Sequence, residues 1–392
     1  MKCIFNTIDF DNIAAQPFTP WGKAHALSFH QGMAPYEITP LVMLPNFAER
    51  LGVSAICVKD ESKRFGLNSF KGLGCSYAMG VYLCEKAGIP VDRAAFSRLC
   101  SPETQKKLGQ YTFITATDGN HGRAVAWAAN LMGHRAVVYM PEGSAQERFE
   151  HIKSLGAEVH ILPRNYDDTV RAAAAAAKAN GWILVQDTAW PGYENVPRLI
   201  MEGYTTLAYE IAKQLAACEK PTHLFLQAGV GSMAGAIAAY FSAQWGADCP
   251  KIIVVEPDQA DCYFRTVQAN DGHLHKVAGK LDSIMAGLCC GEASPLGWEL
   301  LKYAATAFIS CEDECAVKGM QLLGHPEPGD PSIVSGESGA VTAGVLKELM
   351  QNPAYAHVRE KLGLDKDSRV LLISTEGDTD QENYRRIMTF QR

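Results

Sequence analysis

Residues 224–235 of this 392-residue chain read LFLQAGVGSMAG, an apolar run followed by a glycine-rich turn and then by small residues. The run 224–227 predicts a buried strand, and the small residues predict a helix that continues to about Trp245. Backbone amides at such a turn, together with the positive end of the helix dipole, bind phosphate. The stretch therefore predicts a strand–turn–helix unit of an α/β fold with an anion site at its turn.

The same alternation continues along the chain. Short β-branched runs predict strands at residues 55–59, 111–115, 135–140, 158–162, 182–186, 222–227, 251–255, 307–310 and 369–374. Helical patterns lie between them, among them residues 120–132, 145–155, 167–180 and 336–350. Strands that alternate with helices form parallel sheets covered on both faces, so the sequence predicts a doubly wound α/β chain.

The length of the chain predicts two domains, because single cores stop growing at about 250–300 residues. A helical pattern over residues 196–218 is suited to carry the chain from one domain back to the other. We therefore expect a large domain made of residues 1–85 and 220–392, and a small α/β domain, residues 86–219, inserted into it.

Composition excludes several classes of partner. A net charge of -7, a pI near 5.9 and the absence of a long basic run argue against nucleic-acid binding. The N-terminal apolar run is broken at Asn6 and Asp9, and no later segment has about 18 consecutive apolar residues. The 12 cysteines include no C-x-x-C pair and match no structural zinc framework. We expect a soluble, cytoplasmic protein without a membrane, nucleic-acid or metal partner.

Residues 68–72, Asn-Ser-Phe-Lys-Gly, place Lys71 at the end of an apolar-flanked loop and in the first turn of a predicted helix. The helix dipole and partial burial both disfavour the ammonium, so we expect a neutral amine. A neutral lysine can form a Schiff base. Together with the phosphate turn at Gly229, Lys71 suggests a cofactor that carries an aldehyde and a phosphate, and pyridoxal phosphate is the obvious candidate.

The glycine turn does not distinguish between ligands by itself. Gly229, Gly231 and Ala234 also satisfy the G-x-G-x-x-A dinucleotide fingerprint, and Glu256 ends the next predicted strand at about the spacing of a ribose-binding acid. For the turn alone, an NAD site, another phosphate ligand and close helix packing stay open. Lys71 favours the aldehyde cofactor over NAD.

A second turn, residues 117–122, lies between a predicted strand and a predicted helix. Its amides suit a substrate carboxylate, and the Asn120 amide suits a phenolic oxygen on a cofactor ring. A simple capped turn is the alternative, and we expect a structural role for His121.

A third turn, residues 374–380, follows the last predicted strand. We expect Asp378 and Asp380 to serve in capping and turn formation rather than as metal ligands. Because ligands bind at the carboxyl ends of parallel strands, we expect the three turns to meet at one crevice.

Four motifs occur along the chain: Asn68-Ser69-Phe70-Lys71, Asp118-Gly119-Asn120-His121-Gly122, Gly229-Val230-Gly231-Ser232-Met233-Ala234-Gly235 and Gly336-Glu337-Ser338-Gly339-Ala340. Together they resemble the fold-type II pyridoxal phosphate enzymes, the tryptophan synthase β and threonine dehydratase superfamily. Longer phrases at residues 59–68, 186–190 and 373–380 are similar to the diaminopropionate ammonia-lyases within it. The resemblance covers nearly the whole chain in the family's order.

The resemblance implies two doubly wound open-sheet domains with pyridoxal 5'-phosphate in the cleft between them, and a homodimer. It implies a Schiff base on Lys71 beside Phe70, a ring oxygen near Asn120 and a pyridine nitrogen facing Ser374. The phosphate is then held by Gly229, Val230, Gly231, Ser232 and Met233. A hydroxyl partner does not force the ring nitrogen to stay protonated, which favours elimination over transamination. Glu337 either packs near the ring or stabilises a helix N-terminus.

The resemblance further implies α,β-elimination of 2,3-diaminopropionate, in D and L forms, to pyruvate and two ammonia. Lys71 is then the base on one face of the substrate and Asp118 on the other. A carboxylate at position 118 suits a β-ammonium group, because burying an unpaired cation is costly. Asp187, which ends another predicted strand, is a candidate second partner of that group.

Three alternatives stay open. A serine or threonine dehydratase of the same superfamily would share the cofactor residues but would not need Asp118 and Asp187. An NAD-dependent oxidoreductase would use the turn at Gly229 with Glu256. A non-catalytic regulator on the same scaffold would bind the ligand without turning it over.

Overall fold

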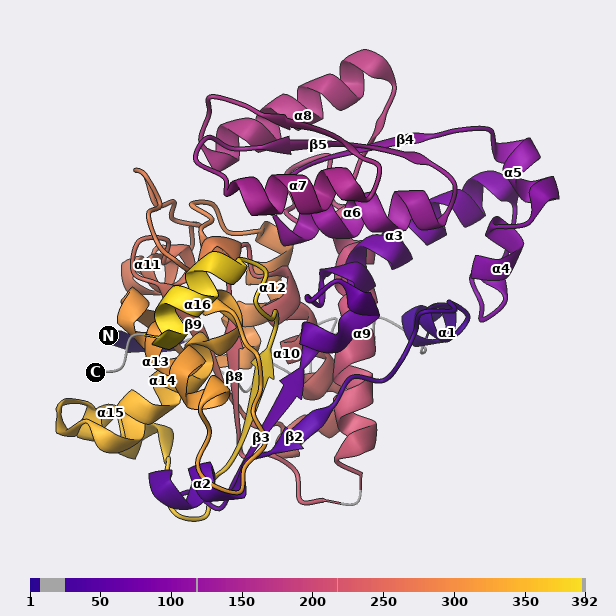
Figure 1. Ribbon diagram of the computed structural model, residues 1–392. Helices are drawn as coiled ribbons and strands as arrows, with labels where there is room; N and C mark the ends of the chain where they lie inside the picture. Colours follow the sequence, from indigo (N-terminus) through magenta and orange to yellow (C-terminus); the bar gives the residue numbers. More distant parts are fainter. Residues whose placement is uncertain (8–24, 118, 217, 390–392) are drawn as a thin grey trace. The chain divides into compact units, whose positions relative to one another are not determined.

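The computed structural model describes residues 1–7, 25–117, 119–216 and 218–389, and it divides into two compact units (Figure 1). Unit 1 comprises the described residues within Met1–Pro20, Thr39–Lys63 and Glu210–Arg392. Unit 2 comprises those within Trp21–Ile38 and Arg64–Tyr209.

Unit 1 is built on a seven-stranded sheet in the order β1-β10-β9-β8-β11-β3-β2. Its strands are β1 (Lys2–Phe5), β2 (Leu41–Met43), β3 (Ala55–Asp60), β8 (His223–Gln227), β9 (Lys251–Pro257), β10 (Ala305–Cys311) and β11 (Arg369–Ser374). The five central strands run parallel and are almost completely buried, which is why their sequences are continuous apolar runs.

The expectation of parallel sheets is wrong at both edges of this sheet. The short strands β1 and β2, which the sequence did not predict, pair antiparallel with β10 and β3. They have four and three residues, so their period-2 pattern is too short to be recognised. The interior of the sheet follows the predicted strands closely.

The helices of unit 1 are α2 (Pro45–Leu51), α10 (Ser232–Trp245), α11 (Cys262–Ala269), α12 (Pro295–Ala304), α13 (Asp313–Gly324), α14 (Glu337–Gln351), α15 (Ala356–Leu362) and α16 (Gln381–Thr389), with short 3-10 turns η3 (Gly246–Asp248), η4 (Ala286–Leu288) and η5 (Pro353–Tyr355). Helices α2, α13, α14 and α15 share one apolar core with the sheet. Helices α13 and α14 meet backbone to backbone, since a Cβ on Gly344 would lie 1.8 Å from the Cys315 carbonyl oxygen. This packing fixes α14, whose first residues lie at the candidate site.

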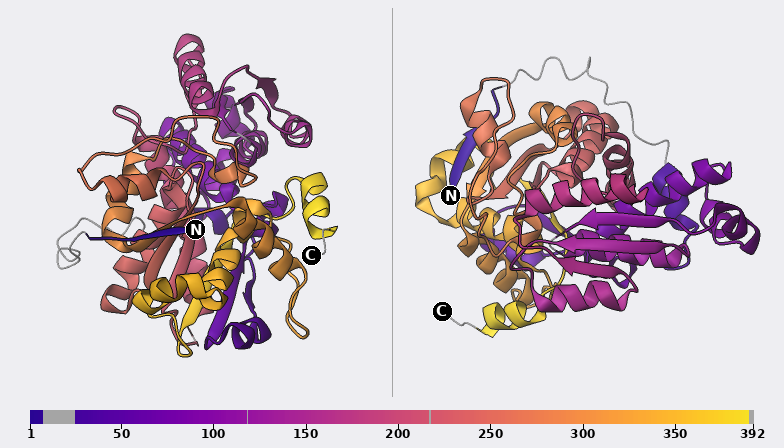
Figure 2. Two further views of the ribbon diagram at one scale, coloured as in Figure 1. Left: turned by 90° about the vertical axis from the view of Figure 1, so that its left-hand side faces the viewer. Right: turned by 90° about the horizontal axis from the view of Figure 1, so that it is seen from above.

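Unit 2 contains a parallel four-stranded sheet in the order β6-β5-β4-β7. The strands are β4 (Thr112–Ala116), β5 (Arg135–Met140), β6 (Glu158–Ile161) and β7 (Ile183–Leu184), and the helices are α1 (His25–Gln31), α3 (Lys71–Ala87), α4 (Ala95–Leu99), α5 (Pro102–Leu108), α6 (Asn120–Leu131), α7 (Gln146–Ser154) and α8 (Tyr166–Asn180). Helix α8 covers one face of this sheet and α6 and α7 the other (Figures 1 and 2). The predicted α/β class is confirmed in both units.

Two of the boundaries between the units fall within elements, η2 (Glu61–Gly66) and α9 (Asn195–Gln214). The domain boundaries expected from the sequence, 86 and 219, differ from this division. Helix α3 belongs to unit 2 because it packs against α6, α4, α5 and α1. Of these neighbours, α1 and α6 are distant in sequence, so a local pattern alone could not have assigned α3 to unit 2. Within the described part of the chain, none of the helices has the length and apolar character needed to cross a membrane.

Candidate active site

Lys71 stands at the start of α3 in unit 2, as the sequence predicted, with Phe70 immediately before it. Its Nζ atom lies 2.5 Å from Asp187 Oδ2, and the Asp187 side chain is buried. Nζ also lies 5.2 Å from the centroid of the Phe70 ring, which in turn packs against Tyr204 of α9 at 4.8 Å. Three of the predicted site residues, Lys71, Phe70 and Asp187, therefore lie close together within unit 2.

The buried carboxylate beside Lys71 opposes the neutral amine expected from the sequence. Burial would raise the pKa of Asp187, but Lys71 and His121 outweigh burial and lower it to about 2. An ionised carboxylate at this distance stabilises the ammonium form of Lys71, not the neutral amine. A helix terminus contributes only about 0.3–1 kcal/mol, which is less than a buried charge-assisted contact provides.

His121 makes contacts that fit the structural role expected for it. Its Nε2 atom lies 2.8 Å from the Val185 carbonyl oxygen, which can only accept, so Nε2 carries the proton. Its Nδ1 atom is 3.5 Å from Cys75 Sγ and 3.7 Å from Asp187 Oδ2. Burial lowers the pKa of His121, against the opposing effect of Asp187. Cys75 was not predicted, although it lies one helical turn after Lys71 and that i, i+4 spacing could have indicated it.

The second predicted turn becomes the N-terminus of α6. Asp118, the proposed base, lies outside the described residues. Asn120 is the first residue of α6, and the preceding Gly119 amide donates to Thr117 Oγ1 at 2.9 Å. The amides of a first helical turn have no acceptor within the helix, so this turn retains donors suited to an anionic group.

The glycine turn of unit 1 joins β8 to α10 and is closely packed. Gly231 has φ +86° and precedes the first helical residues, Ser232 and Met233. The Tyr263 hydroxyl donates to the Val230 carbonyl at 2.7 Å and would lie 2.1 Å from a Cβ at position 231. These contacts require glycine and leave a narrow backbone turn at a helix N-terminus, which fits a phosphate.

Ser374 is the last residue of β11, which runs parallel to its neighbour β8. It therefore lies at the carboxyl ends of these strands, as the glycine turn does. It is fully buried, and its Oγ atom lies 2.7 Å from Ser335 Oγ and 3.3 Å from the Glu376 carbonyl oxygen. Nearby at the start of α14, Ser338 Oγ is buried without a hydrogen-bond partner among the described residues. Such a group costs about 1–3 kcal/mol, which a polar ligand atom would offset. The carboxyl ends of β8 and β11 therefore fit a phosphorylated ring cofactor.

Acidic residues around these strand ends have structural partners. The Glu337 carboxylate accepts a hydrogen bond from Asn383 Nδ2. Asp380 Oδ1 accepts the Asn383 backbone amide at 3.0 Å at the start of α16, as expected for a cap. No group of three or more His, Cys, Asp or Glu side chains suited to a metal occurs among the described residues.

The acid proposed for an NAD site has another role. Glu256 accepts the backbone amides of Tyr263 at 2.8 Å and Phe264 at 2.7 Å, one on each carboxylate oxygen, at the start of α11. Both oxygens are therefore engaged in capping a helix. Glu256 is therefore not placed to bind a ribose, and this argues against an NAD site at the glycine turn.

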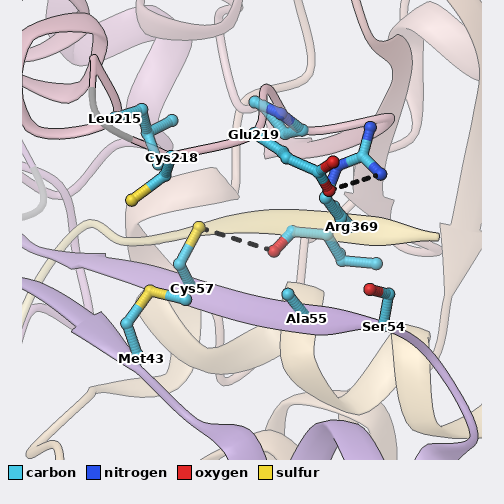
Figure 3. A pocket seen from close by; sticks show the side chains of 10 residues that line it. Met43, Ser54, Ala55, Cys57, Leu215, Cys218, Glu219 and Arg369 are labelled. Atoms are coloured by element: carbon cyan, nitrogen blue, oxygen red, sulfur yellow. Dashed lines mark hydrogen bonds and ion pairs between the residues drawn. The ribbon is translucent and has the colours of Figure 1, made fainter. Parts of the chain in front are cut away.

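A separate cavity of about 190 Å³ lies in unit 1 at the opposite ends of the same strands (Figure 3). Its lining includes Ala55, at the start of β3, and Arg369, at the start of β11. Arg369 pairs with Glu219 at 3.2 Å, and the Cys57 thiol lies 3.7 Å from the Val370 carbonyl oxygen. Ligands of open α/β sheets bind at carboxyl ends, so this cavity is not the cofactor site.

Comparison with known proteins agrees with this chemistry. Residues 34–376 match the model of the pyridoxal-phosphate dependent enzyme family. The chain belongs to this family. It is 49% identical over 365 residues to the diaminopropionate ammonia-lyase of Salmonella typhimurium, covering 92% of this chain and 90% of the relative. With that of Escherichia coli K12 it is 50% identical over 364 residues, covering 93% and 90%.

Solved structures give the same result. The Escherichia coli diaminopropionate ammonia-lyase in complex with D-serine matches with a TM-score of 0.90 at 46% identity, covering 99% of this chain and 96% of that one. The same enzyme with an aminoacrylate-PLP azomethine reaction intermediate matches with a TM-score of 0.89 at 46% identity, again covering 99% and 96%. The expected fold type, cofactor and resemblance are confirmed, whereas the roles of individual residues stay predictions.

Gly231→Ala should lose cofactor binding, because a Cβ at φ +86° would collide with the Tyr263 hydroxyl. Gly246→Ala is the matched control, since it also has positive φ at the other end of α10 but nothing lies within 4 Å of its Cβ. Cofactor content after dialysis, read from visible absorbance, measures the effect. Equal retention by both variants would contradict the assigned turn.

Lys71→Met should destabilise the cofactor-free protein by about 3–5 kcal/mol, because it leaves the buried Asp187 carboxylate without its ammonium partner. Lys71→Arg keeps a positive charge and should lose much less. Urea unfolding at neutral pH measures both values. At pH below about 2, where Asp187 is protonated in the folded protein, the two variants should converge. If Lys71→Met and Lys71→Arg were equally stable at pH 7, the Lys71–Asp187 ion pair would contribute nothing to the free energy of unfolding.

Proposed function

We propose that this protein is a pyridoxal phosphate-dependent ammonia-lyase that converts 2,3-diaminopropionate and water to pyruvate and two ammonia. The observation that carries the proposal is the buried carboxylate of Asp187, 2.5 Å from the Lys71 amine. A carboxylate that accommodates one ammonium group can accommodate the β-ammonium of this substrate. The identity of about half to two diaminopropionate ammonia-lyases supports the same conclusion.

Pyridoxal phosphate, when bound, supplies an aldehyde that joins to amines and a ring that accepts electron density from the α-carbon. We assign the phosphate to Gly229, Val230, Gly231, Ser232 and Met233. We assign the ring oxygen to Asn120 and the pyridine nitrogen to Ser374, and Phe70 would contact the cofactor beside Lys71. Lys71 would supply the amine for that aldehyde.

The Lys71 amine would remove the α-proton on one face of the substrate, and Asp118 would remove it on the other. Asp187 pairs with the β-ammonium group until ammonia leaves. Asp187 pairs with the Lys71 ammonium in the cofactor-free protein, and the β-ammonium group of the substrate would pair with the same buried carboxylate once Lys71 is engaged elsewhere. Loss of ammonia, followed by hydrolysis, gives pyruvate and the second ammonia.

A dehydratase acting on serine is the second candidate. The human L-serine dehydratase/L-threonine deaminase is 28% identical over 276 residues, covering 68% of this chain and 74% of the relative. A neutral hydroxyl leaving group gives no reason for a buried carboxylate at position 187, so we place this activity second. We also propose a cytoplasmic homodimer, which rests on the resemblance alone.

Purified protein supplied with pyridoxal phosphate should form one pyruvate and two ammonia from each molecule of D- or L-diaminopropionate, and should act more slowly on serine. Coupled lactate dehydrogenase and ammonia assays measure both products. Lys71→Arg should reduce turnover by at least about 10³-fold, because a guanidinium is never a neutral nucleophile. A clear preference for serine would favour the dehydratase.

Asp118→Asn should reduce turnover of D-diaminopropionate by about 10²–10⁴-fold, the usual contribution of a general base, and reduce turnover of the L form far less. The ratio of kcat/KM for the two enantiomers is the measurement. Equal loss on both enantiomers would make Asp118 a substrate-binding group instead of a base.

A further inference from the structure

A tyrosine of α9 carries a buried hydroxyl without a partner. Tyr204 is completely inaccessible to solvent, and among the described residues its Oη atom makes no hydrogen bond. Buried polar atoms are almost always paired, because an unpaired one has lost its hydrogen bonds to water without replacing them. The Tyr204 hydroxyl is therefore suited to a partner that the folded chain does not itself supply.

Tyr204 lies beside the start of α3, where Lys71 stands. Its ring centroid is 4.8 Å from that of Phe70, the residue before Lys71. A Cβ on Gly74, which follows Lys71 within one helical turn, would lie 2.8 Å from Tyr204 Cζ, the carbon that bears the hydroxyl. These residues and Asp187 all belong to unit 2. The hydroxyl is therefore part of the same cluster as the Lys71–Asp187 pair.

Two glycines allow α9 to approach α3 this closely. A Cβ on Gly203 would lie 2.5 Å from the Leu73 carbonyl oxygen, and one on Gly74 would lie 2.6 Å from Tyr204 Cε1. Neither position accepts a larger side chain unless the helices move apart. The close packing holds the tyrosine ring in one place, so its hydroxyl is preorganised for a ligand atom.

The charges around the hydroxyl indicate which ligand atom suits it. Burial raises the pKa of Tyr204 well above its ordinary value, and Asp187 adds to this effect while Lys71 opposes it. The side chain is therefore a neutral phenol, whose oxygen can accept a hydrogen bond. An ammonium group has three N–H donors, so it can pair with the Asp187 carboxylate and also donate to the Tyr204 oxygen.

We propose that Tyr204 is a specificity-determining residue that accepts a hydrogen bond from the β-ammonium group of a diamino acid, while Asp187 supplies the opposite charge. The inference rests on the proposed function, in which Asp187 pairs with that group. A serine hydroxyl in the same place would gain less, because a hydrogen bond to a neutral group is roughly half as strong as one to a charged group. Tyr204 thereby favours an amine over a hydroxyl as the leaving group.

Tyr204→Phe tests this role, because it removes the hydroxyl and keeps the ring. The ratio of kcat/KM for diaminopropionate to kcat/KM for D-serine should fall about 10-fold. The change should appear mainly as a higher KM for diaminopropionate, since the bound substrate makes the hydrogen bond before ammonia leaves. The cofactor-free variant should resist urea at least as well as the unaltered protein, because the hydroxyl that it lacks had no partner.

Tyr77→Phe is the matched control, because it removes a buried phenol at another contact between the same two helices. Tyr77 is in α3, and its hydroxyl is hydrogen-bonded to Glu202 of α9. This variant should lower the urea midpoint and leave the substrate ratio unchanged. Gly74→Ala is a second test, since it displaces the Tyr204 ring and should lower the substrate ratio as Tyr204→Phe does.

The outcomes separate this inference from the proposed function. If the unaltered protein prefers diaminopropionate and Tyr204→Phe keeps the same substrate ratio, the inference alone is overturned. An equal loss on both substrates, with a lower urea midpoint, would give Tyr204 a structural role and would also overturn it. A clear preference of the unaltered protein for serine would overturn the proposed function, and the role of Tyr204 with it.

Discussion

Hydrogen bonds that fasten the start of α14 to the ends of β8 and β11 hold together the candidate site of unit 1. The Gln227 side-chain amide donates to the carbonyl oxygens of Ile373 and Ser338, each at 2.9 Å. The Glu376 carboxylate accepts the Ser338 backbone amide at 3.1 Å. Buried loop groups must be paired, so these three segments can adopt few other arrangements. These hydrogen bonds hold the start of α14 against the ends of β8 and β11, beside Ser374, while Gln227 Oε1 and Ser338 Oγ in the same network have no partner among the described residues.

In unit 2 the candidate site is centred on an ion pair, Lys71 with Asp187. Asp187 is buried beside His121, whereas the Lys71 side chain is 17% exposed, so solvent screens the carboxylate of the pair only a little. A pair with one buried member is costly to break and adds little net stability, which is typical of a functional arrangement rather than a stabilising one. The carboxylate that determines the charge of Lys71 before the cofactor joins is also the group best suited to a cationic substrate.

Much of the fold and part of the site could be predicted from the sequence, since both depend on short-range patterns. Apolar runs bounded by glycine turns located the central strands, and the position of Lys71 at a helix start followed from the residues around it. The glycine turn was ambiguous because phosphate binding is a property of backbone amides, which many ligands use. Glu256 resolved that ambiguity only through its contacts with α11.

The sequence by itself determined the α/β class, the strand–turn–helix units and the residue types that carry the chemistry, because these depend on periodicity and on neighbours within a few positions. Only the tertiary structure decided the antiparallel edges, the contact of Lys71 with Asp187 and the pairing of Ser335 with Ser374. Each of these depends on groups that are far apart in the chain and become neighbours on folding. Their energies are set by burial and distance, and neither quantity is encoded in local spacing.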